Sequence, residues 1–141
     1  MNYVAGLFLA FSALSAYASD SAPNCENAMT TADINQCALI ELEAAEAEMH
    51  RYLDAALNDH ETDAALVESI QQAQEAWEGY RQAHCDAVYT QWRDGTIRGV
   101  MSLSCKTQLT QARTHTIWET FLTPMDVMTG EPPSLLPKPN R

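Results

Sequence analysis

Apolar residues recur in steps of four and three between residues 34 and 56. This spacing places them on one face of an α-helix of about six turns. Thr30-Thr31-Ala32-Asp33 fits the capping pattern in which side chains at a helix start satisfy free backbone N–H groups. The first helix is therefore predicted to begin at Thr30 or Thr31 and to end in a polar break at 58–63. Its apolar face comprises Ile34, Ala38, Leu42, Ala45, Met49, Tyr52 and Ala56.

A second helix is predicted from this break to about Arg93. Gly95 follows directly, and glycine readily takes the left-handed conformation that ends many helices. Residues 94–101 contain two glycines and are therefore predicted to form a loop. The apolar face of the second helix is expected to comprise Leu66, Ile70, Ala73, Trp77, Tyr80, His84 and Val88.

A third helix is predicted from Ser102 or Ser104 to about Leu122, because Pro124 ends it. No alternation of apolar and polar residues predicts a strand. The expected fold class is all-α, with three helices in an antiparallel arrangement. The third helix is expected to bury Leu109, Ala112, Ile117 and Phe121.

The N-terminus differs from the helical part of the chain. Residues 3–14 are an apolar run, and Ala16-Tyr17-Ala18 after it matches the small-residue pattern of a signal-peptide cleavage site. The run is shorter than the about 20 apolar residues that span a membrane. We therefore expect residues 1–18 to be a signal peptide cleaved near Ala18, and the mature protein to be periplasmic or secreted in a bacterium.

The C-terminus is rich in proline. Residues 124–141 contain five of the six prolines of the chain. Such a composition favours an extended or disordered tail. The helical domain is therefore predicted to span residues 19–123.

The four cysteines are Cys25, Cys37, Cys85 and Cys105. In a small exported domain an even count predicts two disulfides, although four cysteines allow three pairings. Cys37 and Cys85 are equally distant from residue 61, so a helical hairpin would place them at the same level. This favours Cys37–Cys85 with Cys25–Cys105, and leaves Cys37–Cys105 with Cys25–Cys85 open. The cysteine and histidine spacings match no zinc motif, so neither a metal nor a cofactor is expected.

The charge balance limits the class of partner. Nineteen Asp or Glu oppose eight Lys or Arg, for a formal net charge of −11. This charge argues against nucleic acid and against an anionic membrane surface as partners. Residues 20–78 hold fourteen of the acids and one base, Arg51.

The acidic first helix has two interpretations. It is either the solvated surface of an exported protein or a surface that attracts a basic protein. In the second case the candidate contacts are acids of the first helix, with an aromatic anchor in the second loop. These contacts are Glu41, Glu43, Glu48 and Asp54, together with Trp92, Arg93 and Asp94.

One face of the second helix carries Gln74, Trp77, Arg81 and Cys85, spaced three and four residues apart. The row is either a ligand-binding site or a structural face, and we favour the structural interpretation because buried Arg is readily paired. In a hairpin of the first two helices, Glu41 and Glu46 would lie near the height of Arg81 and are its natural acidic partners. Arg113 of the third helix is a further candidate for the same network of polar contacts. No nucleophile, metalloprotease or phosphate-loop motif occurs, so an enzyme is not expected.

The segment Ala73-Gln74…Trp77…Tyr80-Arg81…Cys85 resembles the LprI-type lysozyme-inhibitor domain of secreted bacterial proteins. The resemblance extends over about residues 25–121 and includes a C-terminal motif around Cys105. Glu46, His50 and Leu53 depart from the residues usual in that family. The family residues that the resemblance implies for the scaffold are Gln74, Trp77, Tyr80, Arg81, Thr110 and Arg113.

The resemblance implies inhibition of lysozyme, by stoichiometric binding of a basic enzyme to the acidic surface. The same surface would serve an immunity or adaptor protein that recognises another envelope or effector protein. A third alternative is an enzyme that acts on cell-wall sugars through paired carboxylates. Turnover of peptidoglycan fragments would distinguish it from a binding protein.

Overall fold

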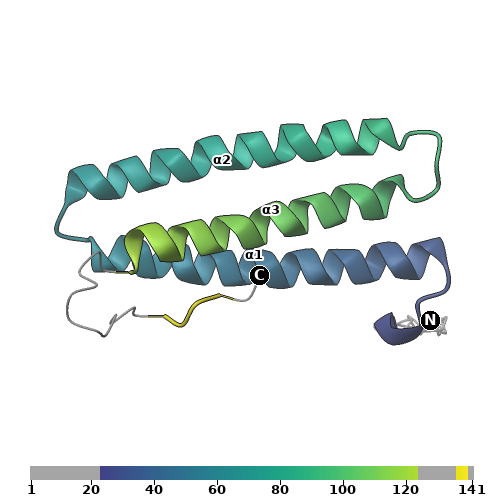
Figure 1. Cartoon of the computed structure of the whole chain (residues 1–141), viewed down its shortest axis with the longest axis horizontal. Coiled ribbons are helices and arrows are strands. Elements are labelled where there is room, and N and C mark those ends of the chain that lie inside the picture. The colour runs from purple at the N-terminus through teal and green to yellow at the C-terminus, as the bar shows by residue number, and fades with distance from the viewer. Residues whose placement is uncertain (1–22, 124–135, 140–141) are drawn as a thin grey trace, which may run out of the picture.

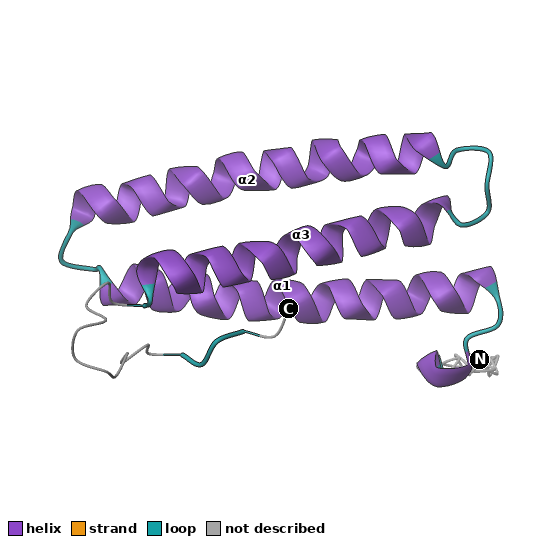
Figure 2. Cartoon of the chain, in the orientation of Figure 1, coloured by secondary structure: helices purple, strands orange, loops and turns teal. Residues whose placement is uncertain are grey.

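The computed structural model describes residues 23–123 and 136–139 of the chain. It contains a short 3-10 helix, η1 (Cys25–Asn27), and three long helices, α1 (Thr31–Asp59), α2 (Ala64–Gln91) and α3 (Arg98–Phe121). The described residues contain no strand (Figure 2). The predicted all-α class is therefore confirmed. The predicted signal peptide, residues 1–18, lies outside the described residues.

The start of α1 follows from its capping residues. The Thr30 hydroxyl accepts a hydrogen bond from the Asp33 N–H at 3.1 Å and donates to the Asp33 carboxylate at 2.7 Å. This reciprocal contact stabilises the first turn, where backbone N–H groups have no helical partner. The Asp63 carboxylate caps α2 in the same way, by accepting from the Leu66 N–H at 3.1 Å. The predicted break at 58–63 is confirmed.

The helix α3 begins at Arg98, earlier than the predicted Ser102. Gly95 does not take the left-handed conformation expected of it. Gly99, predicted to lie in the loop, belongs to the first turn of α3. A Cβ added there would lie 2.4 Å from the Asn35 side-chain oxygen, so Gly99 allows α3 to approach α1 closely.

The three helices lie alongside one another, and the chain reverses direction between α1 and α2 and again between α2 and α3 (Figure 1). The helix α3 packs against both α1 and α2, whereas the backbones of α1 and α2 approach each other at few points. Arg81 of α2 nevertheless reaches Glu46 of α1, with its Nη1 2.8 Å from the carboxylate.

The hydrophobic core lies toward the end of the bundle where α1 turns into α2. All of the predicted α1 face is buried except Ile34, which is 39% exposed. On α3, Ile117 is buried as predicted, but Ala112 is exposed and Leu109 and Phe121 are half-buried. The residues that form this core are Met49, Tyr52, Leu53, Ala56, Ile70, Ile117 and Leu122.

The remaining buried positions of α3 carry hydroxyl groups instead of large apolar side chains. Thr107 and Thr114 donate to carbonyl groups one turn earlier in their own helix, which satisfies their polar atoms without a partner helix. Small side chains suit α3 because it has a helix on two sides. These positions are Ser102, Thr107, Thr110 and Thr114.

The buried face of α2 differs from the predicted one. Ala73 and His84 are exposed, and Tyr80 is 54% exposed. The face that meets the other helices instead carries the polar row identified in the sequence, with Gln74 and Cys85 buried and Trp77 and Arg81 half-buried. Of the predicted face, Ile70 is buried and Leu66, Trp77 and Val88 are half-buried. Apolar periodicity therefore identified this part of the face and missed the rest, because α2 also buries polar side chains against α3.

The disulfides join Cys25 to Cys37 and Cys85 to Cys105. Both pairings left in consideration by the hairpin argument are therefore wrong. Equal height along two helices did not bring Cys37 to Cys85, because Cys85 faces the start of α3 and Cys37 faces η1. Each disulfide instead links segments that are neighbours in the chain.

Candidate functional site

The central polar contact of the bundle is made by Arg81. Its Nη1 lies 2.8 Å from the Glu46 carboxylate of α1 and donates to the Thr110 hydroxyl of α3 at 2.7 Å. One guanidinium group therefore connects all three helices. Glu46 is one of the two acidic partners that the hairpin level predicts, and the other, Glu41, does not pair with Arg81.

Arg113 of α3 extends this arrangement along the same interface. Its Nε donates to the Gln74 side-chain oxygen at 3.0 Å, and the Gln74 amide donates to Glu78 at 3.1 Å. The Arg113 Nη2 is buried and has no hydrogen-bond partner among the described residues. Burial lowers the pKa of the Arg113 guanidinium, because removal from water disfavours its charged form.

Trp77 lies beside both guanidinium groups. The centre of its ring is 5.0 Å from the Arg81 guanidinium carbon and 5.9 Å from that of Arg113. Such cation–π contacts stabilise charge that is shielded from water. We call this set the interhelical cluster: Glu46, Gln74, Trp77, Arg81, Thr110 and Arg113.

The interhelical cluster favours the structural interpretation of the α2 row. Its side chains bond to one another across the helices, and the side chain of Arg81 is only 17% exposed. Tyr80, which the resemblance groups with these residues, lies outside the cluster and stacks on His84 with ring centres 5.5 Å apart.

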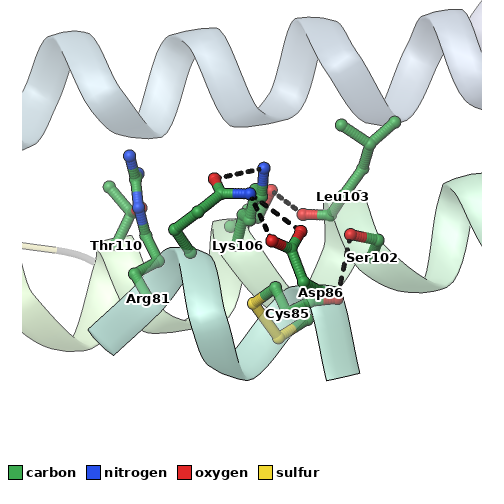
Figure 3. The surroundings of a disulfide bond; sticks show 10 residues. Arg81, Cys85, Asp86, Ser102, Leu103, Lys106 and Thr110 are labelled. Carbon is green, nitrogen blue, oxygen red and sulfur yellow. Dashed lines mark hydrogen bonds between the residues drawn. A yellow bond between two sulfur atoms is a disulfide. The ribbon is translucent and has the colours of Figure 1, made fainter. Parts of the chain in front are cut away.

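The Cys85–Cys105 disulfide fixes α2 to α3 beyond this cluster (Figure 3). The Ser102 hydroxyl donates to the Cys85 carbonyl at 3.2 Å. The Lys106 ammonium donates to the Gln82 side chain at 3.0 Å. These contacts hold both ends of the loop between α2 and α3 in place.

That loop carries the predicted aromatic anchor. Trp92 ends α2 and is 38% exposed, and Arg93 and Asp94 are exposed. The Arg98 guanidinium donates to the Arg93 carbonyl at 3.2 Å, which ties the loop to the start of α3. The structure therefore presents these three residues at one end of the bundle, the end at which α1 begins (Figure 1).

The four predicted acidic contacts of α1 lie on two faces of the helix. Glu41 and Glu48 are seven residues apart and share one face, at about 200° from the face of Glu43 and Asp54. Glu48 is half-buried and forms an ion pair with Arg51 at 2.7 Å. The structure does not bring all four acids together, and we call Glu43 and Asp54 the outer acidic pair.

Glu41 and Glu48 line a groove between α1 and α3 with a volume of about 380 Å³. Its α3 wall carries Thr107, Gln111 and Thr114. Pro139 from the C-terminal tail forms a further part of the lining. We call this the α1–α3 groove.

Four residues of the predicted tail belong to the described part of the chain, and they form no helix. The segment Leu136–Pro139, called the tail segment below, lies against α1 and α3, and Pro139 is buried. Tyr52 and Trp118 both donate hydrogen bonds to its backbone. The sequence had assigned Tyr52 to the core alone, and no repeat or motif pointed to Trp118. Residues 124–135 and 140–141 of the predicted tail lie outside the described residues.

Neither a cluster of metal-ligating side chains nor a membrane-spanning helix occurs within the described ranges 23–123 and 136–139. No group of three His, Cys, Asp or Glu side chains there could hold a metal ion. No helix in that part of the chain is long and apolar enough to cross a membrane.

Comparison with known proteins identifies a family. A family model described as lysozyme inhibitor LprI matches residues 22–117 of the chain. An uncharacterized protein of Rhizobium meliloti (strain 1021) is 30% identical over 115 residues, covering 74% of this chain and 83% of that protein. No solved structure matches the chain.

Proposed function

Because the chain belongs to the LprI family of lysozyme inhibitors, we propose that it is an exported, non-catalytic inhibitor that binds a basic lysozyme stoichiometrically. Membership implies a lysozyme-inhibitor-like binding function. The proposal adds the sign of the partner's charge, the surface that binds it, and removal of residues 1–18 on export.

The distribution of charge over the bundle supports this proposal most strongly. Glu41, Glu43 and Asp54 of α1 are exposed, whereas Arg81 and Arg113 are directed into the interhelical cluster. Acids therefore face solvent while two basic groups are neutralised or shielded inside the bundle. A surface of this kind attracts a basic protein over distances near the Debye length, about 10 Å at 0.1 M salt.

The outer acidic pair is the better candidate for the first contact. Glu43 and Asp54 are exposed and form no ion pair with any of the described residues, whereas Glu48 is engaged by Arg51. An unpaired carboxylate loses no existing partner when a lysine or arginine approaches. Trp92 supplies an exposed aromatic side chain for a second contact, which would place a bulky group against the enzyme.

The experiment titrates the oxidised protein against a basic lysozyme and follows cell-wall lysis at low and high salt. We expect saturable one-to-one inhibition that weakens as salt increases. Failure of a catalytically inactive basic lysozyme to bind at low salt contradicts the proposal, and turnover of peptidoglycan fragments would identify an enzyme instead.

Matched variants locate the surface. E43Q/D54N, E41Q/E48Q and the control E61Q/E75Q each remove two negative charges, and Glu61 and Glu75 are exposed on the α1–α2 turn and α2. We expect E43Q/D54N to weaken binding about tenfold and the control to weaken it less than about twofold. Equal effects of all three variants would show that only net charge matters and would contradict a defined surface.

The same acidic surface suits an immunity or adaptor protein. Binding of a basic envelope protein other than lysozyme, with the same dependence on Glu43 and Asp54, would favour that alternative. Such a result would leave the surface as proposed and change the identity of its partner.

A further inference from the structure

Two aromatic side chains on neighbouring helices donate hydrogen bonds to successive carbonyl groups of the tail segment. The Tyr52 hydroxyl of α1 donates to the Pro137 carbonyl at 2.5 Å. The Trp118 indole N–H of α3 donates to the Leu136 carbonyl at 3.1 Å. Tyr52 is fully buried, and the Pro137 carbonyl satisfies its hydroxyl group.

Side chains of the tail segment also contact α1 and α3 beside Tyr52 and Trp118. Leu136 packs against the hydrophobic core. Pro139 is buried and lines the α1–α3 groove beside Glu41 and Glu48. The Lys138 ammonium lies 5.8 Å from the centre of the Trp118 ring, where a cation–π contact stabilises it.

These contacts are typical of the recognition of extended proline-containing peptides. Proline has no backbone N–H, so Pro137 and Pro139 present carbonyl groups without donors that need acceptors. Aromatic side chains that donate to such carbonyls, and apolar pockets that hold every second or third residue, form the binding surfaces for these peptides. Tyr52 and Trp118 supply the donors, and the hydrophobic core holds Leu136. The α1–α3 groove beside Pro139 is lined mainly by Glu, Gln, Thr and Ala side chains.

The charge of the groove selects among such peptides. Glu41 and Glu48 lie beside Pro139, and because Glu48 is paired with Arg51, Glu41 is the carboxylate left to attract a basic residue. The tail carries Lys138 and Arg141 in its sequence. A basic residue next to proline is therefore favoured over an acidic one.

We propose that the face formed by Tyr52, Trp118 and the α1–α3 groove is a binding site for an extended, basic, proline-containing peptide segment. Its resident ligand is the chain's own tail segment, and a partner protein binds there by displacing that segment with one of the same chemistry. This site is separate from the outer acidic pair of the proposed function, and its test uses no lysozyme.

The tail segment competes with any free peptide for this site because it belongs to the same chain. A tethered segment has an effective concentration in the millimolar range, so a free peptide of equal intrinsic affinity competes poorly. Removing the tail contacts increases the fraction of molecules with an open site and so increases apparent affinity in proportion.

The test uses a synthetic peptide of residues 134–141 and the full protein with both disulfides formed. In the variant L136S/P139S the tail loses its buried side chains while Tyr52 and Trp118 remain. The readout is the indole N–H resonance of Trp118 in NMR spectra, assigned by its absence in Trp118→Phe.

In the native protein we expect this N–H to exchange slowly with solvent and to be insensitive to added peptide. In L136S/P139S we expect faster exchange, and saturable peptide binding at least about tenfold tighter than in the native protein. Adding Tyr52→Phe to that variant removes one donor and is expected to weaken peptide binding several-fold. A peptide with both prolines replaced by alanine is the matched control and is expected to bind less well.

Three results would overturn the proposal. The first is rapid exchange of the Trp118 indole N–H in the native protein. The second is peptide binding that neither Tyr52→Phe nor Trp118→Phe weakens, in variants whose circular dichroism shows a folded helical protein. The third is a dimer that dissociates in L136S/P139S, which would assign the tail segment to a second copy.

Discussion

Arg81 of α2 forms an ion pair with Glu46 of α1, at 2.8 Å, across two helices whose backbones approach each other at few points. The same guanidinium group donates to Thr110 of α3. The third helix therefore does more than cover the hairpin of the first two. It supplies the Thr110 hydroxyl group, which accepts a further hydrogen bond from the Arg81 guanidinium between α1 and α2.

Removing the Arg81 side chain is expected to cost more stability than removing that of Glu46. In Glu46→Ala the guanidinium keeps Thr110 and gains access to water, so we expect a loss of about 1–2 kcal/mol. Arg81→Leu leaves Glu46 and Thr110 without their donor, and we expect a loss of about 2–4 kcal/mol. Urea unfolding of both variants and of the double variant gives the coupling energy.

The exposed pair of Glu48 and Arg51 is the control for this prediction. Both side chains are more than 40% exposed, so Arg51→Gln is expected to cost much less stability than Arg81→Leu. Equal losses for Arg51→Gln and Arg81→Leu would contradict a structural role for the interhelical cluster.

The disulfide pairing can be read from a tryptic digest of the unreduced protein. The chain has no Lys or Arg before Arg51, so Cys25–Cys37 is expected inside the peptide that ends there. Cys85–Cys105 is expected to join the peptides 82–93 and 99–106. A fragment in which Cys85 is linked to the peptide ending at Arg51 would contradict the structure.

The second disulfide is expected to contribute more to stability than the first. Loop closure favours the separation of 20 residues over that of 12 by about 0.5 kcal/mol in the chain-entropy model. Cys85 is also fully buried, whereas Cys25 is exposed. Replacing each pair by serine and comparing urea midpoints measures this order, and a larger loss from the first pair would contradict it.

The sequence contained enough information for the helices and not for their lateral arrangement. Thr30 and Asp63 begin helices through local hydrogen bonds, and local patterns are visible in a sequence. The faces and disulfides depend on which helices are neighbours. Placing α3 against α2 buries Gln74 in place of Tyr80 and brings Cys105 to Cys85, and periodicity along one helix carries no such information.

Some contacts of the candidate site could likewise be predicted from the sequence and others could not. Residue level along a hairpin offered both Glu41 and Glu46 to Arg81, because the rise per residue fixes only height, and only Glu46 forms the ion pair. The contacts of Tyr52 and Trp118 with the tail segment could not be predicted, since Pro137 is 85 residues from Tyr52 and composition alone describes the tail.

Alkaline pH is expected to destabilise the protein through Tyr52. Burial raises the pKa of Tyr52 above its usual value near 10, and the negative charge of Glu48 raises it further while Arg51 opposes both. The native state then holds its phenolic proton at pH values at which the unfolded chain has lost it. This contribution to stability is present below about pH 10 and is lost as pH rises through the raised pKa.

Comparison of the native protein with Tyr52→Phe isolates that contribution. We expect the native protein to lose more stability than Tyr52→Phe between pH 9 and pH 11 in urea unfolding, by up to about 1.4 kcal/mol for each unit of pKa difference. Parallel curves for the two proteins would contradict a raised pKa at this position.

Alanine substitution at two helical glycines is expected to have different outcomes. A Cβ at Gly79 meets no atom within 4 Å, so Gly79→Ala is expected to stabilise the protein by about 0.5–1 kcal/mol through helix propensity. At Gly99 the new carbon would lie 2.4 Å from the Asn35 oxygen, and Asn35 would have to leave its 2.8 Å hydrogen bond with the Thr31 carbonyl. That rearrangement offsets the gain in propensity, so we expect Gly99→Ala to be about 1–2 kcal/mol less favourable than Gly79→Ala.

The close approach of α1 and α3 is then tested in an Asn35→Ala background. With the Asn35 amide removed, the Cβ at position 99 has space, and Gly99→Ala is expected to become as stabilising as Gly79→Ala. The difference between the two backgrounds, measured by urea unfolding, is the coupling between Asn35 and position 99. If Gly99→Ala stabilises the unmodified protein as much as Gly79→Ala does, the glycine does not serve helix packing, and its role is confined to the start of α3.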